Sequence, residues 1–185
     1  MTAPSRIDHP TLQRVKEAFS ACRLRATQFR GDTTLIVEPK DLHRVMQFLR
    51  DDPECRYCFL AELGGVDYLN YPQPMPGRFA VVYVLRSFER DACLTVKTFV
   101  DPSVPTDGAE PDPALVVDSV TDIWPGAEWP EREVFDMYGV RFRGHPDLRR
   151  LLTWEEFPAH PLRKDYPQRG RGERETYRVL DRTSS

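Results

Sequence analysis

The chain has 185 residues, of which 40% are apolar, so its length fits one ordinary domain and its composition excludes wholesale disorder. Its longest apolar run, Phe79 to Leu85, is far shorter than the roughly 20 residues of a membrane helix, and the first ten residues lack the apolar stretch of a secretory signal. The net charge of -3 is unevenly spread, because residues 1–140 carry -7 and residues 141–185 carry +4. We therefore expect any link to a membrane to pass through another protein.

The first predicted elements are a helix, a strand and a second helix. Apolar side chains at spacings of three and four predict an amphipathic helix from His9 to Leu24. The β-branched run from Thr33 to Val37 predicts a short strand. Pro39 then begins the second helix, which reaches Arg50 and carries its apolar residues on one stripe.

A β-hairpin is predicted in the middle of the chain. Residues 55–71 favour neither helix nor strand, and several prolines interrupt the segment that follows them. The β-rich runs Phe79 to Phe88 and Ala92 to Val100 are separated by only three residues, which is typical of a tight hairpin. Alternation within the second run predicts that one of its faces is more solvated. Residues 101–113 predict a surface loop, and residues 115–117 one further short element.

The last predicted helix ends before Gly139, a residue suited to a left-handed stop. Because a proline in the interior of a helix costs roughly 3 kcal/mol, we expect a short turn from Pro125 to Trp129. The helix that follows would then contain Pro130 in its first turn. Glu131 and Glu133 would lie near its N-terminus, where the helix dipole favours negative charge.

Together these elements predict an α+β fold, an α/β sandwich in which helices pack on a small mixed β-sheet. The apolar fraction falls from about 44% in residues 1–140 to about 27% in residues 141–185. A segment so poor in apolar residues can hardly build a core of its own. We therefore expect an α/β globular domain at residues 1–142 and an extended, basic, partner-binding tail at residues 143–185.

The four cysteines do not predict a disulfide framework, because the chain shows no secretory signal. Cys55 and Cys58 form a CxxC pair, a spacing found in zinc sites and in thioredoxin-like redox sites. A zinc site needs two further ligands at suitable spacing, and a redox pair normally opens a helix after a strand; the sequence provides neither the ligands nor the preceding strand. We interpret the pair as two small, partly buried residues, and its role stays open.

Three strings near the C-terminus carry the most specific information. We call them motif one (residues 131–139, EREVFDMYG), motif two (144–152, GHPDLRRLL) and motif three (160–167, HPLRKDYP). Motifs two and three combine proline, histidine and clustered arginine with little periodicity. Because proline favours extended backbone and arginine presents a planar fork of donors, such segments are suited to lie against an acidic or carbonyl-rich partner surface.

Motif one places several charged side chains on a helix. Arg132 and Asp136 are four residues apart, close enough to form a pair on one helix face. Glu131, Glu133 and Asp136 could instead serve as a general acid–base set, but the helical spacing points Glu133 away from Glu131 and the sequence shows no nucleophile. We therefore expect a solvated or salt-bridged helix face.

The three motifs, in this order and spacing, closely resemble the C subunit family of respiratory complex I (NADH:quinone oxidoreductase), the thirty-kilodalton subunit of mitochondria. The match is most specific from Glu131 to Pro167 and weaker upstream, where the segment Gly65 to Tyr68 precedes the proline-rich loop. Two departures from the family pattern, Pro130 and Ala159, affect only local backbone.

The resemblance implies a non-catalytic structural subunit of the peripheral arm, on the cytoplasmic side of the cell inner membrane. It implies that the chain itself binds no flavin, cluster or metal, and that FMN, iron–sulfur clusters and quinone are held by partner subunits. The implied partners are chiefly the D subunit, near the quinone-reducing module, and neighbouring iron–sulfur subunits. The match assigns to the signature helix Glu131, Arg132, Glu133 and Asp136, and to the partner-facing segments His145, Pro146, Arg149, Arg150, His160, Pro161, Arg163, Lys164, Asp165 and Tyr166.

Two other roles stay open at this point. One is the equivalent subunit of a complex I relative, such as a membrane-bound hydrogenase or a ferredoxin- or F420-dependent dehydrogenase. The other is a free-standing redox or hydrolytic enzyme built on the CxxC pair or the carboxylates. His145 and His160 have no second ligand at a metal spacing, and acidic residues interrupt the basic tail. We therefore expect neither a metal site nor nucleic-acid binding.

Overall fold

The structure is a computed structural model that describes residue 7 and residues 9–173. Predictions for residues 174–185, the end of the expected tail, lie outside these described residues. In chain order the elements are α1 (Pro10–Ala18), β1 (Leu24–Phe29), β2 (Asp32–Val37), α2 (Pro39–Asp51), β3 (Phe59–Asp67), β4 (Phe79–Ser87), β5 (Ala92–Val100), β6 (Val116–Asp118), the 3-10 turn η1 (Pro125–Ala127), α3 (Glu128–Tyr138) and β7 (Arg141–Arg143).

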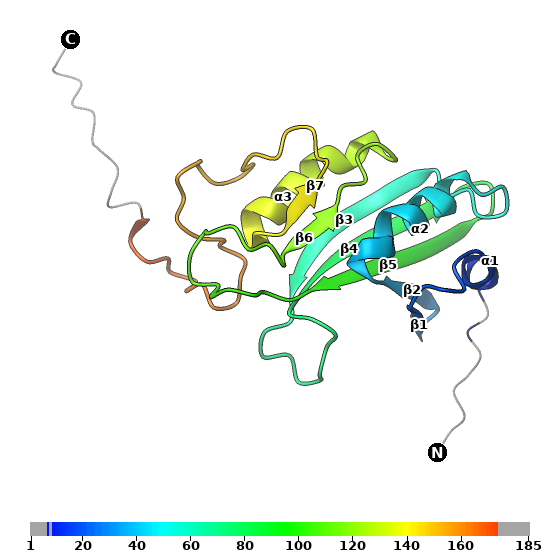
Figure 1. Cartoon of the computed structure of the whole chain (residues 1–185), viewed down its shortest axis with the longest axis horizontal. Coiled ribbons are helices and arrows are strands. Elements are labelled where there is room, and N and C mark those ends of the chain that lie inside the picture. The colour runs from blue at the N-terminus through cyan, green and yellow to red at the C-terminus, as the bar shows by residue number, and fades with distance from the viewer. Residues whose placement is uncertain (1–6, 8, 174–185) are drawn as a thin grey trace, which may run out of the picture.

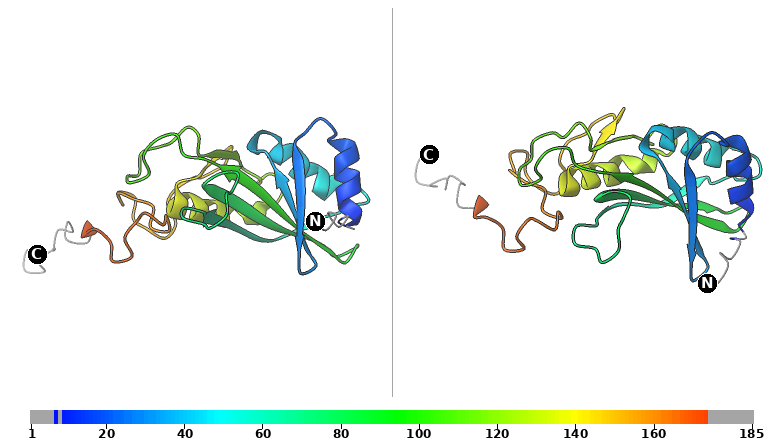
Figure 2. Two further views of the ribbon diagram at one scale, coloured as in Figure 1. Left: turned by 90° about the horizontal axis from the view of Figure 1, so that it is seen from below. Right: turned by 60° about the horizontal axis from the view of Figure 1, so that its bottom comes forward.

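Five strands form a mixed sheet in the order β1-β2-β5-β4-β3, in which β2 and β5 are parallel and the other neighbours antiparallel. The short strands β6 and β7 form a second, parallel pair. Helices α1, α2 and α3 lie on the same side of the large sheet (Figures 1 and 2). The predicted α+β fold with a small mixed sheet is therefore confirmed.

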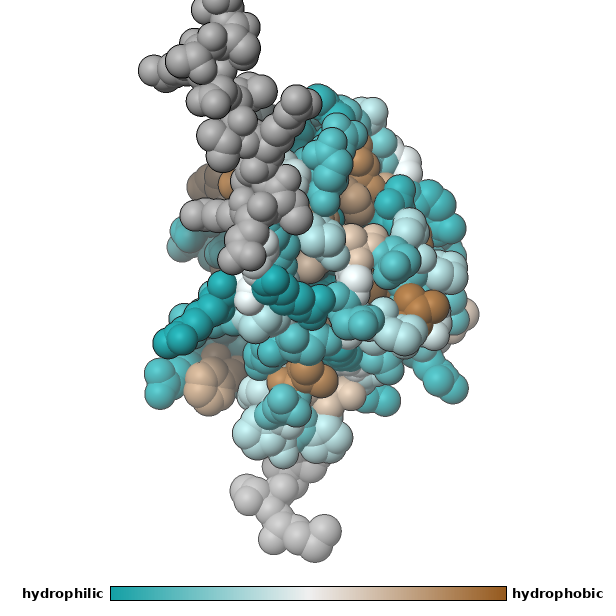
Figure 3. Space-filling view, turned by 90° about the vertical axis from the view of Figure 1, so that its left-hand side faces the viewer, coloured by the Kyte–Doolittle hydropathy of each residue, from teal (hydrophilic) through white to brown (hydrophobic). Residues whose placement is uncertain are grey.

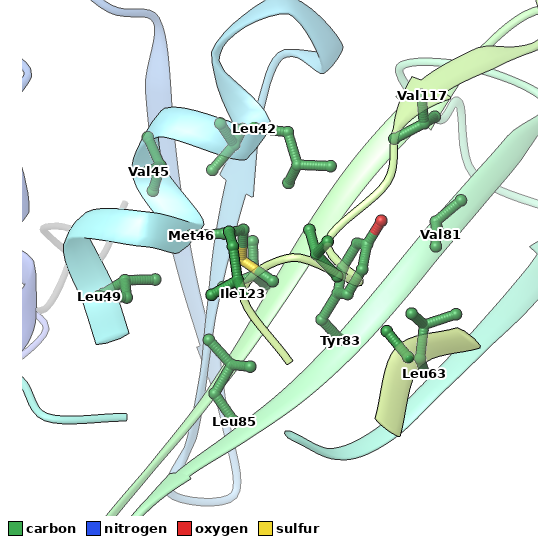
Figure 4. Packing of buried hydrophobic residues seen from close by; sticks show 14 of the residues in the cluster. Leu42, Val45, Met46, Leu49, Leu63, Val81, Tyr83, Leu85, Val117 and Ile123 are labelled. Carbon is green, nitrogen blue, oxygen red and sulfur yellow. The ribbon is translucent and has the colours of Figure 1, made fainter. Parts of the chain in front are cut away.

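The core lies between α2 and the large sheet (Figure 4). Leu42, Val45, Met46 and Leu49 recur at helical spacing and form the buried stripe of α2, which packs over the alternate residues Val81, Tyr83 and Leu85 of β4. Each such side chain contributes about 1.5–3 kcal/mol by leaving water. The other side chains of β4 and β5 are partly exposed in the middle of the sheet, as the alternation predicts.

The first helix is shorter than predicted, and a strand follows it. Helix α1 ends at Ala18, whereas the spacing predicted a helix as far as Leu24. The apolar spacing continues through a turn in which Cys22 N–H donates to the Phe19 carbonyl at 3.0 Å. Leu24 then begins β1, an edge strand that pairs with β2 and is largely exposed, so its polar sequence carries no alternation. The predicted helix, strand and second helix are thus all present in that order, but the additional strand β1 between the first helix and β2 was not predicted.

The undetermined residues 55–71 contain β3, which pairs along its length with β4 and bulges between Leu60 and Glu62. The CxxC pair therefore precedes a strand and does not open a helix. Cys55 is buried and Cys58 is exposed, and both are free thiols. Burial raises the pKa of the Cys55 thiol to about 12, so this residue holds little of the thiolate that redox exchange requires.

Candidate functional site: three motifs joined around helix α3

Helix α3, which carries motif one, begins and ends as its sequence predicts. Pro130 lies in the first turn, where its missing N–H costs nothing, and Gly139 ends the helix with a φ of 79°. The glycine also allows a close approach. A Cβ at position 139 would overlap the Arg163 guanidinium and stand 2.7 Å from His160 Nε2. The end of motif one is thus shaped to receive motif three.

Asp136 joins α3 to motif two. Its fully buried carboxylate accepts hydrogen bonds from the backbone N–H groups of Leu151, Leu152 and Thr153 at 3.0, 2.7 and 2.8 Å. It also accepts from the Thr153 hydroxyl at 2.5 Å and from Arg150 Nη1 at 2.8 Å. Burial opposes ionisation, but these donors outweigh it and hold the pKa of Asp136 below its usual range.

The expected pair of Arg132 with Asp136 is replaced by contacts from both residues to motif two. Arg132 Nε donates to the Arg149 carbonyl and Nη2 to the Arg150 carbonyl, each at 3.1 Å. The expected solvated or salt-bridged face is wrong for Glu131, which is fully buried with no ion pair among the described residues. Asp136 is salt-bridged but equally buried, because the loop of motif two folds over it.

Glu131 faces the opposite side of α3 from the tail and anchors the connection after β6. Its carboxylate accepts hydrogen bonds from the Ser119 hydroxyl at 2.6 Å and from Val120 N–H at 2.8 Å. Burial raises the pKa of Glu131 to about 7, and these two donors only partly offset it. The carboxyl is thus a structural tie between α3 and the small sheet.

Motif three caps the C-terminus of α3. The carbonyls of Asp136, Met137 and Tyr138 have no partner within the helix, and they accept hydrogen bonds from His160 Nδ1 at 2.8 Å, Leu162 N–H at 3.1 Å and Arg163 Nε at 2.8 Å. Because a carbonyl only accepts, His160 carries its proton on Nδ1. Burial lowers the pKa of His160 to about 4, so the ring is neutral at pH 7.

Beyond the helix, motif three reaches the end of the large sheet. Lys164 N–H donates to the buried Asp67 carboxylate at 2.9 Å, and Asp165 forms an ion pair with Arg78 at 2.9 Å. Arg78 also pairs with Asp67 at 3.0 Å, so one network joins strand β3, the loop before β4 and the tail. Arg163 Nη1 adds a hydrogen bond to the Thr106 carbonyl at 3.0 Å.

His145 of motif two holds the first turn of α3. Its Nε2 lies 2.9 Å from the Glu128 carbonyl, and its Nδ1 accepts the Asp147 N–H at 3.0 Å. The described part of the tail has no helix or strand after β7, yet it is fixed by side chains from all three motifs. We refer to residues 144–167 in this arrangement as the wrapped segment.

The residues predicted to face a partner differ widely in exposure. His160 and Arg163 are buried within this chain, His145, Arg150, Pro161 and Tyr166 are half-buried, and the exposed ones are Pro146, Arg149, Lys164 and Asp165. The sequence reasoning missed Leu152 and Leu162, whose exposed fractions are 65% and 51%. Residues 141–185 are poor in apolar side chains, so each leucine in this segment was a signal in the sequence that could have identified the two exposed residues. On the face of the molecule where this segment lies, hydrophobic residues are scattered in a hydrophilic surround (Figure 3).

Within residue 7 and residues 9–173, no cluster of three or more His, Cys, Asp or Glu side chains could hold a metal ion. In the same residues, no helix is both long and apolar enough to cross a bilayer.

Comparison with known proteins decides the family. The family model described as the 30 kDa subunit of respiratory-chain NADH dehydrogenase matches residues 35–172. The chain belongs to this family. The C subunit of NADH-quinone oxidoreductase from Roseiflexus castenholzii is 45% identical over 165 residues, which cover 87% of this chain and 85% of that protein. The same subunit from Thiobacillus denitrificans is 43% identical over 159 residues, covering 84% of this chain and 74% of that protein.

Two solved structures resemble the 30 kDa family member described here. A trypsin-resistant fragment of Nqo5, residues 1–134, is 29% identical with a TM-score of 0.57, and the match covers 75% of this chain and 96% of the fragment. A chain of an archaeal membrane-bound sulfane sulfur reductase shares the fold, with a TM-score of 0.64 at 21% identity over 95% of this chain and 94% of that one. The family predicted from the three motifs, and the role as a subunit of NADH-quinone oxidoreductase, are confirmed.

Proposed function

We propose that this chain is a non-catalytic, cofactor-free structural subunit of the peripheral arm of proton-translocating NADH:quinone oxidoreductase, and that its wrapped segment binds the D subunit. The observation that carries the proposal is the conformation of this segment. Buried Asp136, His160 and Arg163 hold it in place, and the same fold leaves Leu152 and Leu162 exposed. The electrons would pass from NADH through FMN and iron–sulfur clusters in other subunits to quinone.

The exposed leucines support a protein partner. Binding of another protein over Leu152 and Leu162 would remove their apolar surface from water, which favours association. Lys164 is exposed in the same segment and supplies a positive charge at the rim, which steers association more than it adds affinity. We therefore expect the D subunit to present an apolar recess with acidic residues around it.

The contacts that hold the wrapped segment within this chain also support the proposal, because they reduce the conformational entropy lost on binding. Ordering a flexible segment on binding costs about 0.5–1.5 kcal/mol for each immobilised side chain. Here the contacts to α3 already fix the loop of motif two and the cap of motif three. We infer that the wrapped segment is shaped before docking, with neighbouring iron–sulfur subunits as further partners. On this proposal the chain is peripheral at the cytoplasmic side of the inner membrane, attached through the complex.

Charged substitutions of the exposed leucines test the proposal. We expect the double variant Leu152→Asp and Leu162→Asp to fold normally, because both side chains already face water. It should fail to co-purify with the D subunit from membranes in mild detergent. Phe29→Asp is the matched control, because Phe29 is 72% exposed on edge strand β1, away from the wrapped segment. Full assembly of the double variant would contradict the interface.

A further inference from the structure

A cavity of about 360 Å³ lies between the wrapped segment, the C-terminal half of α3 and the loop at residues 109–111. Three exposed glutamates line it: Glu110, Glu155 and Glu156. Within the part of the chain that the structure describes, none of the three forms a hydrogen bond or an ion pair. The proposed function, which uses the exposed leucines, assigns them no role.

The cavity carries a negative charge. Two guanidinium groups also line it, but Arg150 is already paired with the buried Asp136 at 2.8 Å. Arg141 therefore stands alone against three carboxylates, and its guanidinium lies 5.4 Å from the ring centre of Phe135. A recess lined mainly by one sign of charge concentrates ions of the opposite sign, so the cavity favours a cationic group.

His160 adds a neutral acceptor to the same wall. It lines the cavity although only 4% of it is exposed, and its Nδ1–H is used by the Asp136 carbonyl. Nε2 therefore carries the lone pair, and it has no hydrogen-bond partner among the described residues. Nε2 is not among the buried side-chain atoms that lack a partner in the described chain, so it is open to the cavity and can accept a hydrogen bond from a ligand there.

The shape of the site selects an extended cation over a metal ion. No three ligand side chains among the described residues come close enough together to hold a metal. Phe135 and Phe157 also line the cavity, and each already has a guanidinium group of this chain near its ring, Arg141 at 5.4 Å and Arg150 at 5.9 Å from the ring centres. A guanidinium also has five N–H donors in a planar fork, which suits carboxylates and an imidazole acceptor presented from different sides.

We propose that this cavity receives an arginine side chain of the subunit on which the wrapped segment docks. The inference rests on the proposed function, since the arginine comes from that partner. His160 Nε2 and the carboxylates of Glu155 and Glu156 accept its N–H groups. The exposed leucines then provide the apolar contact, and the cavity fixes the register of the two chains.

A cross-link within the assembled complex identifies the occupant. Pro158 lines the cavity and is exposed, so a photoreactive amino acid at this position should capture the occupant without removing a carboxylate. We expect mass spectrometry to find a partner peptide that contains an arginine at the site of capture. A peptide without arginine, or no cross-link to any partner in the assembled complex, overturns the proposal.

A double-mutant cycle then measures the contact. We expect the pair Glu155→Gln and Glu156→Gln to weaken co-purification with the complex about tenfold, and substitution of the captured arginine by glutamine to do the same. The combination should be no worse than either change alone, whereas independent losses overturn the proposal. Asp51→Asn with Glu62→Gln is the matched control, because it removes two exposed charges elsewhere.

The outcomes separate this inference from the function on which it rests. If the leucine variant loses the partner while the glutamine pair assembles at the normal level, the docking surface stands and the arginine site falls. If both variants assemble at the normal level, both proposals fail. If both lose the partner and the cycle shows coupling, both stand.

Discussion

Asp136 shows how much one carboxylate can organise in this chain. Three consecutive backbone N–H groups, a hydroxyl and a guanidinium converge on it, although the residues that supply them lie 14–17 positions further along the sequence. A loop without helix or strand is thereby given a single conformation. The donor groups would be buried without partners if the carboxylate were lost, and such groups are costly.

We therefore expect Asp136→Asn to destabilise the chain by about 3–5 kcal/mol, because Arg150 would keep a largely buried charge without its partner. The side-chain amide of an asparagine at this position would also place its own N–H groups against the N–H and O–H donors of the loop. Urea unfolding of the full chain measures the effect. Glu133→Gln is exposed on the same helix and should change stability by less than about 0.5 kcal/mol. Equal effects of the two changes would refute this role of Asp136.

Glu131 makes stability depend on pH near neutrality. Burial raises its pKa in the folded chain to about 7, above the ordinary value of 4.5, so the folded state favours the protonated carboxyl. Its contribution is complete below about pH 4.5 and is lost as the pH rises through 7, by up to about 3 kcal/mol. Glu131→Gln should remove this part of the decline in unfolding free energy between pH 5 and pH 8. Glu133→Gln should leave the decline as it is in the unaltered chain.

The residues that join the motifs are only partly visible in the sequence. The family signature identifies Glu131, Arg132 and Asp136 as important residues. Helical spacing then predicts a pair between Arg132 and Asp136, because spacing describes contacts within one helix and not contacts with a distant loop. Thr153, which makes two of the bonds to Asp136, lies outside every motif. Its role depends on a loop that folds back over the helix, and no local propensity encodes that return.

At the scale of elements, α3 and β3 meet at a contact that only glycine permits. A Cβ at position 65 would lie 2.5 Å from Cδ2 of the Tyr138 ring. We expect Gly65→Ala to destabilise the chain by about 1–3 kcal/mol through overpacking. Gly64→Ala is its matched control, because nothing lies within 4 Å of a Cβ there. Thermal unfolding of both variants checks this, and a similar loss in the two would contradict a steric cause.

The elements that the sequence predicts correctly are those with a buried face. Helix α2 and strands β4 and β5 pack against the core on alternate or helically spaced residues, so their periodicity is clear. Edge strand β1 is exposed nearly throughout and has no such pattern. In β3 the bulge at Leu60 and Glu62 interrupts the alternation, so propensity alone left the segment undetermined.

At the scale of the whole molecule, the wrapped segment is part of the fold as well as a candidate interface. Truncation after Arg143 would remove every donor to the Asp136 carboxylate and every cap on the last carbonyls of α3. We expect the remaining chain to lose at least about 3 kcal/mol of stability, because it loses the hydrogen bonds to Asp136 and the buried apolar contacts of Phe157. Truncation after Pro167 keeps all these groups and is the control. Calorimetry of the two truncated proteins would reveal equal melting temperatures if the segment were only an appendage.

The groups that cap α3 are synthesised later than the helix itself. The helix lies at residues 128–138, but the groups that complete its C-terminus belong to residues 160–163. While the ribosome is still extending the polypeptide between these points, the last carbonyls of the helix lack the donors of motif three. On the proposed function, the docking surface that includes Leu162 is therefore complete only after the cap of motif three has been synthesised.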